Sequence, residues 1–289
     1  MISIDGKATA TTIYEELKSE IAPLQQKPCV CFVRVGEDPA SISYLNKKQK
    51  VASDLGIQSH LHALDASISQ DALLERITDL NADSSVHGIL VQSPLPEHLA
   101  EHEVFNAVSP AKDVDGFHSV SLGKLIQEDS DGFIPCTPGG IIELLSRYEI
   151  QTEAKHVVIL GRSTIVGKPL AQLLCRKHKN GNATVTLCHS RTKDVTQLTQ
   201  QADILIAAIG KPGYVSENMV REETTVIDVG INRIEDPSRK SGYRLVGDVD
   251  YDGVKSKCSH ITPVPGGVGP MTVAMLMKNT IRAYKSQVF

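Results

Sequence analysis

Three polar residues on one predicted helix are the first candidates for chemistry. Ser41, Tyr44 and Lys48 lie at i, i+3 and i+7 of a segment that begins near Pro39, so they share one helix face. That face is polar where a core helix would be apolar, and an amine beside an aromatic ring could move protons next to a flat substrate. Lys48 also belongs to the run KKQK (47–50), so a helix face in contact with water stays open as the alternative.

An amide and two carboxylates add further candidates in the first half of the chain. Gln92 ends a strand at a proline-rich turn, and Asp113 and Asp115 lie in the irregular segment KDVDGF. The structural alternatives are a capping amide for Gln92 and an ordinary turn for the two acids, because Asp followed by Gly is common in turns. The histidines, cysteines and carboxylates form no array with ligand spacing, so no metal site is expected.

A segment rich in proline and glycine precedes the last predicted helix. It runs from 261 to 272 and reads ITPVPGGVGPMT, and half of its positions are Pro or Gly. Pro263 and Pro265 restrict the backbone, whereas Gly266 and Gly267 permit conformations that other residues avoid. A wall with so few side chains lets a flat ligand approach the main chain closely.

A second ligand-binding segment reads GRSTIVGKP (161–169), between a buried strand and a helix. Gly161, Ser163 and Gly167 fit the turn of a Rossmann fold, where N–H groups at a helix start receive a pyrophosphate. The spacing departs from GxGxxG, because Ser163 replaces the second glycine and the third falls one position late. An ordinary strand–helix turn therefore remains the alternative.

The end of the following strand indicates which cofactor binds. An NAD enzyme usually has Asp or Glu there, but this chain reads CHSRT (188–192), with Ser190 and Arg191 and no acid. With Arg162 in the first turn, the site suits a 2′-phosphate, which guanidinium groups bind through paired hydrogen bonds. The residues predict NADP, not NAD.

Strands and helices that alternate along the chain must position these residues. Such alternation predicts an α/β fold with parallel sheets and helices on both faces. The expected strands are 29–36, 58–64, 86–92, 155–161, 183–189, 203–210 and 224–230, and the expected helices are 39–56, 69–82, 138–149, 166–178, 194–202 and 271–286. The segment 93–138 is expected to be irregular and to end at the domain boundary.

Length and composition exclude several classes of protein. A chain of 289 residues with 41% hydrophobic content is typical of two globular domains, and a net charge of −4 argues against non-specific nucleic-acid binding. Its six cysteines include no CxxC pair, which favours reduced thiols. We see no signal peptide and no apolar run of the ~20 residues that a membrane helix needs, so a soluble, cytoplasmic protein is expected.

Together these segments resemble the methylenetetrahydrofolate dehydrogenase/cyclohydrolase family over nearly the whole chain. One departure is Ser93, where the family more often has leucine after the glutamine. The motifs that carry the resemblance are VGEDPASISYLNKKQK (35–50), GILVQSPLP (88–96), KDVDGF (112–117), PCTPGG (135–140), GRSTIVGKP (161–169), CHSRT (188–192), DVGIN (228–232), GDVD (247–250) and ITPVPGGVGPMT (261–272).

The resemblance implies two domains flanking a cleft, onto which Lys48 and the turn 161–167 open from opposite sides. Residues 1–138 with 271–289 would bind folate, and the final helix would return to that domain. Residues 139–270 would form a Rossmann-like, doubly wound parallel sheet for NADP. The implied reaction oxidises 5,10-methylenetetrahydrofolate to the methenyl cation and hydrolyses it to 10-formyltetrahydrofolate. The family also implies a homodimer.

The resemblance further implies roles for single residues. Lys48 would be the main catalytic lysine, Tyr44 would stack on the folate, Gln92 would hydrogen-bond near the reacting centre, and Asp115 would hold the pterin. The implied substrate wall is Pro263, Pro265, Gly266 and Gly267, and the implied cofactor-binding residues are Gly161, Arg162, Ser163, Ser190, Arg191 and Ile231. A cation beside Lys48 and burial under Tyr44 would both lower the pKa of that amine.

Three other functions stay open. A shikimate-type NADP dehydrogenase shares the two-domain layout, but we find no lysine–aspartate catalytic pair of the kind it uses. A non-catalytic NADP-binding module would not need Tyr44, Lys48 and Gln92 together. A monofunctional dehydrogenase would keep the same residues and lose only the hydrolysis.

Overall fold

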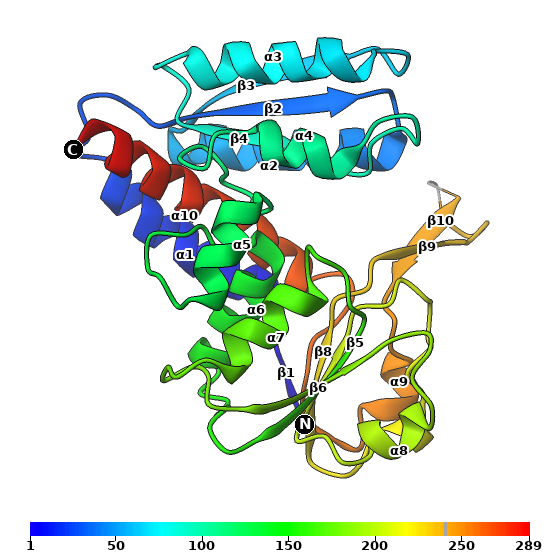
Figure 1. Ribbon diagram of the computed structural model, residues 1–289. Helices are drawn as coiled ribbons and strands as arrows, with labels where there is room; N and C mark the ends of the chain where they lie inside the picture. Colours follow the sequence, from blue (N-terminus) through cyan, green and yellow to red (C-terminus); the bar gives the residue numbers. More distant parts are fainter. Residues whose placement is uncertain (240–241) are drawn as a thin grey trace. The chain divides into compact units, whose positions relative to one another are not determined.

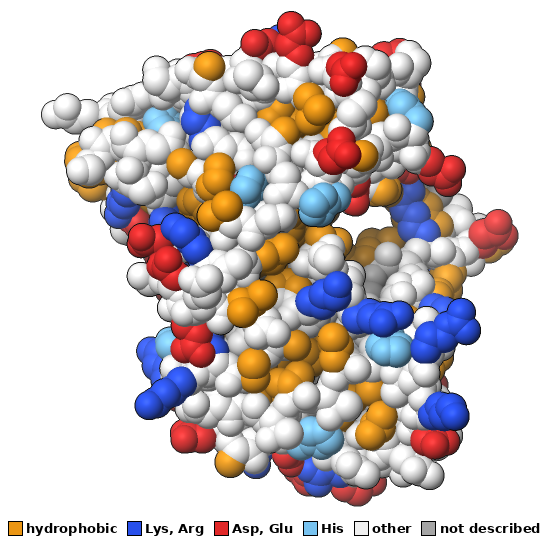
Figure 2. Space-filling model, in the orientation of Figure 1, with side chains coloured by type: hydrophobic (Ala, Val, Ile, Leu, Met, Phe, Trp, Pro, Cys, Tyr) orange, Lys and Arg blue, Asp and Glu red, His pale blue; other side chains and the backbone are white. Residues whose placement is uncertain are grey.

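The computed structural model describes residues 1–239 and 242–289, which fold into two compact units. Unit 1 comprises Met1–Thr11 and Thr137–Thr272, and unit 2 comprises Thr12–Cys136 and Val273–Phe289. Figure 1 shows the elements of both, and Figure 2 shows that acidic and basic side chains are both present on the face in view.

Unit 2 is built on a three-stranded parallel sheet with the order β3-β2-β4. The central strand β2 reads CVCFVRV and is buried along almost its whole length, as expected for a strand covered on both faces. Helices α3 and α4 contribute to one apolar cluster with β2 and β4. The bounds of these elements are β2 (Cys29–Val35), α2 (Pro39–Leu55), β3 (Gln58–Leu64), α3 (Gln70–Ala82), β4 (Gly88–Val91), α4 (Glu101–Ala107) and α5 (Ser119–Ile126).

Helices α4 and α5 lie in the segment 93–138, so the expectation of an irregular segment is wrong at these two places. Their ends carry weak sequence signals. Ala100 precedes α4 without a side-chain cap, and the residue that caps α5 is His118, whose ring accepts from the Val120 N–H. Neither is among the residues usually found at helix starts, so pattern reasoning had no start signal to use.

Unit 1 is built on a six-stranded sheet in the order β1-β11-β8-β7-β5-β6, in which every neighbouring pair is parallel. From β5 the chain moves outward to β6 and then returns to β7 on the other side, so the strand order reverses between β5 and β7. This is the doubly wound arrangement that the alternation predicts. Its elements are β1 (Ile2–Ser3), α6 (Cys136–Arg147), β5 (His156–Leu160), α7 (Gly167–Cys175), β6 (Thr184–Cys188), α8 (Val195–Thr199), β7 (Ile204–Ala207), η1 (Glu217–Met219), β8 (Thr224–Asp228), β9 (Asn232–Glu235), β10 (Tyr243–Val246), α9 (Tyr251–Val254) and β11 (Cys258–Ile261).

The first eleven residues belong to unit 1, whereas the sequence places all of 1–138 in the first domain. Strand β1 pairs with β11 in parallel, and the Ile4 N–H donates to the Ile261 carbonyl at 2.8 Å. The partner strand lies more than 250 residues away in the chain. A local pattern therefore cannot predict this pairing.

Two helices run from one unit into the other. Helix α1 (Gly6–Ile21) begins in unit 1 and ends in unit 2, and so does α10 (Val268–Val288). Within unit 2, the Asn279 amide of α10 donates to the carbonyls of Val114 and Ile134. The prediction that the final helix returns to the first domain is confirmed.

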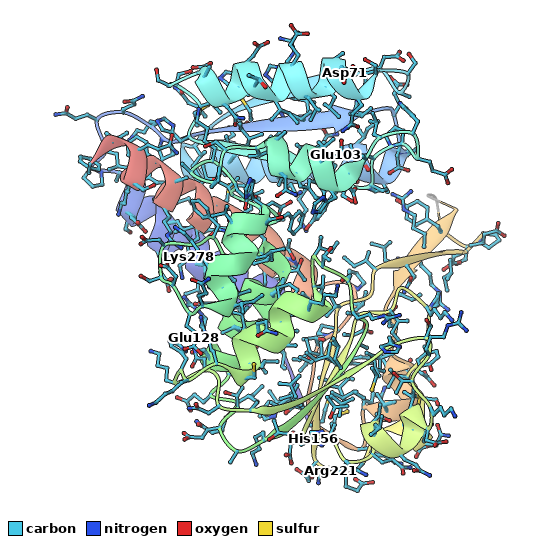
Figure 3. The ribbon with its side chains drawn as sticks, in the orientation of Figure 1. Asp71, Glu103, Glu128, His156, Arg221 and Lys278 are labelled. Atoms are coloured by element: carbon cyan, nitrogen blue, oxygen red, sulfur yellow. The ribbon has the colours of Figure 1, made fainter. Side chains whose placement is uncertain are left out.

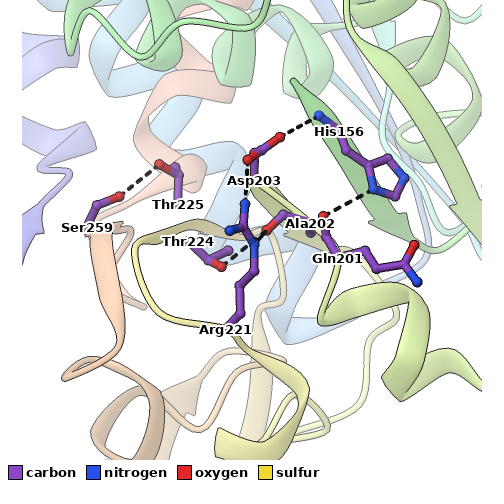
Figure 4. A network of polar contacts seen from close by, with 8 residues as sticks. All are labelled: His156, Gln201, Ala202, Asp203, Arg221, Thr224, Thr225 and Ser259. Carbon is purple, nitrogen blue, oxygen red and sulfur yellow. Dashed lines mark hydrogen bonds and ion pairs between the residues drawn. The ribbon is translucent and has the colours of Figure 1, made fainter. Parts of the chain in front are cut away.

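A polar network ties together the amino ends of strands in the six-stranded sheet (Figure 4). Asp203, just before β7, accepts from the His156 N–H at 2.8 Å and pairs with the guanidinium of Arg221. Arg221 also donates to the Ala202 carbonyl at 3.0 Å. His156 and Arg221 lie close together in Figure 3, at the edge of the sheet where β5 begins.

Candidate functional site

Lys48 is buried, with a side chain of which only 4% is exposed, although it stands in a run of lysines. Its Nζ donates to Oε1 of Gln92 at 3.0 Å and lies 4.6 Å from the centroid of the Tyr44 ring. The structure therefore brings Lys48, Tyr44 and Gln92 together. The alternative of a helix face in contact with water does not hold for Lys48.

Helix α2 and strand β4 fix this arrangement. Asp38 caps α2 by accepting from the Ser41 N–H at 2.7 Å, and Pro39 occupies the first turn, where its missing N–H costs nothing. After β4, the Gln92 N–H donates to the Val33 carbonyl, and its side-chain amide donates to the Ser93 carbonyl at 2.6 Å. That second bond leaves the Gln92 oxygen free to face the amine.

A tight turn carries Asp115. The buried carboxylate of Asp113 accepts from the N–H groups of Phe117 and His118, both at 3.0 Å, and from the Ser121 hydroxyl at 2.6 Å. Gly116 has φ +78°, and a Cβ there would lie 2.6 Å from the Pro135 nitrogen, so only glycine fits. Asp113 thus stabilises the turn by hydrogen bonds, in agreement with the structural alternative given for this residue.

Burial and charge act in opposite directions on Lys48 and Asp115. Burial lowers the pKa of Lys48, and the charge of Asp115 opposes that effect. Burial likewise raises the pKa of Asp115, and the charge of Lys48 opposes it. An amine with a lowered pKa is neutral over a wider pH range, and a neutral amine can accept a proton.

The thiol of Cys136 lies near Lys48 and Asp115, and it is a site residue that the sequence does not predict. Its Sγ donates to the Val114 carbonyl at 3.3 Å, and its burial beside Asp115 raises its pKa well above the usual value. The motif PCTPGG was the available signal, but nothing in its spacing relates it to Lys48.

A separate pocket of about 310 Å³ lies in unit 1, at the carboxyl ends of β5, β6 and β7. This is where the strand order reverses, the usual place for a ligand in such sheets. Four of the predicted cofactor-binding residues line it: Gly161, Arg162, Ser163 and Ser190. Among the residues that the structure describes, Arg191 and Ile231 are not part of the lining, although Arg191 is exposed directly beside Ser190.

The turn after β5 fits a dinucleotide. A Cβ on Gly161 would lie 2.1 Å from the Ala208 carbonyl oxygen, and one on Gly167 would lie 2.0 Å from the Gly161 oxygen. The Ser163 hydroxyl accepts from the Val166 and Gly167 N–H groups at 3.2 and 3.4 Å, so it ties the turn to the start of α7. Close backbone approach at such a helix start is the arrangement that receives a pyrophosphate.

The turn after β7 also lines this pocket, and none of its residues is among the predicted cofactor-binding residues. It contributes Ala208, Ile209, Lys211 and Tyr214. The sequence carries a partial signal, because the carboxyl ends of parallel strands lie at one edge of a sheet and the segment follows an expected strand. Its side chains, however, match no dinucleotide motif.

The segment with Pro263, Pro265, Gly266 and Gly267 follows β11 in unit 1. The Gly266 carbonyl, in a residue with φ +112°, accepts from the Lys7 N–H at 2.9 Å, and a Cβ on Gly6 would lie 1.8 Å from the Gly267 oxygen. Close packing against the start of α1 therefore accounts for part of the glycine content.

Two further findings concern only residues 1–239 and 242–289. In these ranges no group of His, Cys, Asp or Glu side chains is arranged to hold a metal ion. None of their helices combines the length and apolar character required to cross a membrane.

Comparison with known proteins relates both units to one family. Residues 4–115 match the catalytic domain of tetrahydrofolate dehydrogenase/cyclohydrolase, and residues 135–288 match its NAD(P)-binding domain. The chain is 53% identical to the Bifunctional protein FolD of Chlorobium phaeobacteroides (strain BS1), over 98% of this chain and 97% of that protein.

Two crystal structures are similar to this fold. The bifunctional FolD of Campylobacter jejuni has a TM-score of 0.93 at 45% identity, with 100% of both chains covered. FolD of Trypanosoma brucei, complexed with NADP and an inhibitor, has a TM-score of 0.95 at 38% identity, over 100% of this chain and 98% of that one.

Proposed function

Because this chain belongs to the tetrahydrofolate dehydrogenase/cyclohydrolase family, we propose that it oxidises 5,10-methylenetetrahydrofolate with NADP and hydrolyses the product to 10-formyltetrahydrofolate. The assignment of catalytic residues depends on one observation. The buried Lys48 amine is hydrogen-bonded to Gln92 and lies over the Tyr44 ring. Lys48, Tyr44, Gln92 and Asp115 then form the folate site of unit 2, and unit 1 binds NADP.

Substrate binding follows from the chemistry of these side chains. The ionised Asp115 can accept two parallel N–H bonds from the aminopyrimidine edge of a pterin, as carboxylates do with guanidinium groups. The Tyr44 ring offers a face on which the flat pterin can stack. Bound NADP supplies the acceptor for the hydride that leaves the methylene carbon. Pro263, Pro265, Gly266 and Gly267 would let a flat ligand approach the main chain of unit 1 closely.

Hydrolysis needs a group that handles protons. Water attacks the methenyl carbon, the neutral Lys48 amine takes a proton from that water, and the bond from this carbon to N5 breaks. N5 receives a proton, the formyl group stays on N10, and one proton is released overall. Gln92 orients the amine without adding charge. Burial lowers the pKa of Lys48, and a cationic substrate beside the amine would act in the same direction.

Cofactor selection rests on the pocket of unit 1. We expect Arg162, Ser190 and Arg191 to bind the 2′-phosphate, since residues 188–192 at the end of β6 include no carboxylate that would bind a ribose hydroxyl. Gly161 and Ser163 would receive the pyrophosphate, and Ile231 would contact the cofactor. The homodimer and the cytoplasmic location are also proposals, and sedimentation and cell fractionation would test them.

An absorbance assay with methylenetetrahydrofolate and either NADP or NAD tests the function. We expect NADP reduction together with the rise and decay of the methenyl species. Reduction with a methenyl species that never decays would instead identify a monofunctional dehydrogenase. No reduction with either cofactor would refute the proposed oxidation.

A further inference from the structure

Two sequence motifs each place a carboxylate in the core of unit 1 that has no role in the sites described so far. DVGIN (228–232) contains Asp228, of which 3% is exposed, and GDVD (247–250) contains Asp248, of which 0% is exposed. Neither residue lines the cofactor pocket as the structure describes it. Buried acids are costly unless they are well bonded, so their partners indicate what they hold.

The partners of Asp248 include the wall of the cofactor pocket. Its Oδ2 accepts from the backbone N–H groups of Ile209 at 2.7 Å and Gly210 at 2.9 Å. Its Oδ1 accepts from the side-chain amide of Asn232 at 2.8 Å. Ile209 lines the pocket, so the carboxylate is hydrogen-bonded to the backbone of the turn that forms this part of the lining.

The backbone of the same motif holds the remainder of this turn. The Gly213 N–H donates to the Gly247 carbonyl at 3.2 Å, and the Val215 N–H donates to the Asp248 carbonyl at 2.9 Å. The loop 209–215 is therefore fixed at both of its ends by residues 247–248. Between those ends it carries Lys211 and Tyr214, which are exposed and line the pocket.

Asp228 in turn fixes the position of Asp248. Its carboxylate accepts from the N–H groups of Asp248 at 2.9 Å, Val249 at 3.0 Å and Gly230 at 3.0 Å. A Cβ on Gly247 would lie 1.7 Å from Asp228 Oδ2, and one on Gly230 would lie 2.3 Å from Asp248 Oδ1. The glycines of both motifs are required because the two carboxylates occupy that space.

We propose that Asp248 is a positioning residue for NADP: it holds the loop 209–215 so that Lys211 and Tyr214 face the cofactor. This inference rests on the proposed cofactor site of unit 1. An ammonium group in the pocket lining suits the phosphates of a dinucleotide, and an aromatic ring suits its flat bases. A loop with neither helix nor strand structure needs an anchor to keep these groups in place.

The carboxylate chemistry can be tested by a nearly isosteric change. The three groups that bond to the Asp248 carboxylate are all donors. A carboxylate, which only accepts, therefore satisfies all three. In Asp248→Asn the new NH2 group either faces the Ile209 and Gly210 N–H groups or forces the Asn232 amide to turn and give up its bond to the Val246 carbonyl. We expect the KM for NADP to rise at least about tenfold, while kcat changes less than about twofold.

The matched control is Asp250→Asn, the same change two residues along in the same motif. Asp250 is exposed, and its side chain accepts from the Gly253 N–H at the start of α9. Its backbone N–H donates to the Val215 carbonyl at 2.9 Å, and the change to Asn leaves that backbone bond in place. We expect the control to keep the parent KM for NADP. Hydrolysis of methenyltetrahydrofolate without NADP should stay at the parent rate in both variants, because Lys48 and its partners lie in unit 2.

Hydrogen exchange gives a readout that does not depend on activity. Backbone amides of 208–215 should exchange faster in Asp248→Asn than in the parent or in Asp250→Asn.

If Asp248→Asn fails to fold, Asn232→Ala removes one hydrogen-bond partner of Asp248 and should also raise the KM for NADP, by a smaller factor. An unchanged KM with unchanged exchange would overturn the inference, and so would a fall in kcat without a change in KM. A parent enzyme that does not oxidise methylenetetrahydrofolate would refute the proposed function instead, and the exchange result would still report on the loop.

Discussion

At the scale of single residues, the function of this dehydrogenase/cyclohydrolase depends on the protonation state of Lys48. We predict that Lys48→Met lowers the rate of methenyltetrahydrofolate hydrolysis at least ~100-fold, because the change removes the amine proposed to accept the proton of the attacking water. Affinity for NADP should not change, since that pocket lies in unit 1. The decay of methenyl absorbance measures the first effect, and a binding titration measures the second.

The matched control is Lys47→Met, which removes an exposed amine from the preceding position of α2. It should hydrolyse the methenyl substrate at the parent rate. If Lys48→Met does so too, Lys48 is not the proton acceptor.

Selection of the 2′-phosphate is also a property of single side chains. We predict that Arg162→Ala combined with Arg191→Ala lowers the NADP/NAD ratio of kcat/KM at least about tenfold, because guanidinium–phosphate pairs are among the strongest charged hydrogen bonds. Steady-state kinetics with both cofactors provide the ratio. Lys179→Ala removes an exposed charge from the same unit and serves as the control. An unchanged NADP/NAD ratio in the double variant would show that other residues select NADP.

Sequence reasoning found the residues that share a local pattern and missed those that meet only in the fold. Tyr44 and Lys48 are one helical turn apart on α2, so their common face can be read from spacing. The burial of Lys48 cannot be read from spacing, because it depends on groups such as Gln92, which follows strand β4. Cys136 and Lys211 are isolated residues whose neighbours come from other segments, and no spacing rule identifies them.

At the scale of elements, a buried lysine stabilises the end of helix α3. Lys112 is 6% exposed, and its Nζ donates to the carbonyls of Leu80 at 3.1 Å, Asn81 at 2.9 Å and Asp83 at 2.7 Å. Carbonyls at the end of a helix lack partners within the helix, and the helix dipole favours a cation there. This residue gives KDVDGF a structural role beside that of Asp115.

We predict that Lys112→Met lowers the free energy of unfolding by about 2–4 kcal/mol, because it leaves these carbonyls without a charged donor. Urea unfolding followed by far-UV circular dichroism measures this loss. Lys50→Met, which changes an exposed residue of α2, should stay within about 0.5 kcal/mol of the parent. Equal effects in the two variants would contradict a specific role for Lys112.

The elements themselves differ in how far the sequence determines them. Long strands and helices such as β2 and α2 carry clear hydrophobic patterns and a clear cap, and they occur where expected. The four-residue strands β4 and β7 also lie within expected strands, because they are fully buried and apolar. The antiparallel pair β9–β10 and strand β11 are not predicted, because their sequences mix polar and apolar residues and tertiary pairing decides their structure.

At the scale of the whole molecule, the two-unit architecture follows from the alternation of elements, but the membership of the chain ends does not. The N-terminal residues join unit 1 through one short strand, and α10 ends in unit 2. Both outcomes depend on pairing between distant segments. The order of motifs along the chain, more than any local pattern, is what identifies the family from the sequence.

Stability of the whole molecule should depend on pH through its buried acids. Burial raises the pKa of Asp113 to about 7 and that of Asp228 to about 6, from a usual value of 3.8. Over that interval the folded state binds more protons than the unfolded state, so these groups make the free energy of unfolding fall as pH rises. Carboxylates with lowered pKa values, such as Asp65, act in the opposite direction and only below pH ~4.

Asp113→Asn isolates one of these contributions, because asparagine does not titrate. We predict that the free energy of unfolding of the parent, minus that of the variant, falls by up to about 4 kcal/mol between pH 4 and pH 7 and is constant above pH ~8. Urea unfolding at several pH values measures this difference, and subtraction removes the titration of groups that both proteins share. Asp65→Asn should give a difference that does not change above pH ~5, since its carboxylate is already ionised there in both states. A parent–variant difference for Asp113 that rises with pH would mean that the buried carboxylate is stabilised by its three donors more strongly than burial destabilises it.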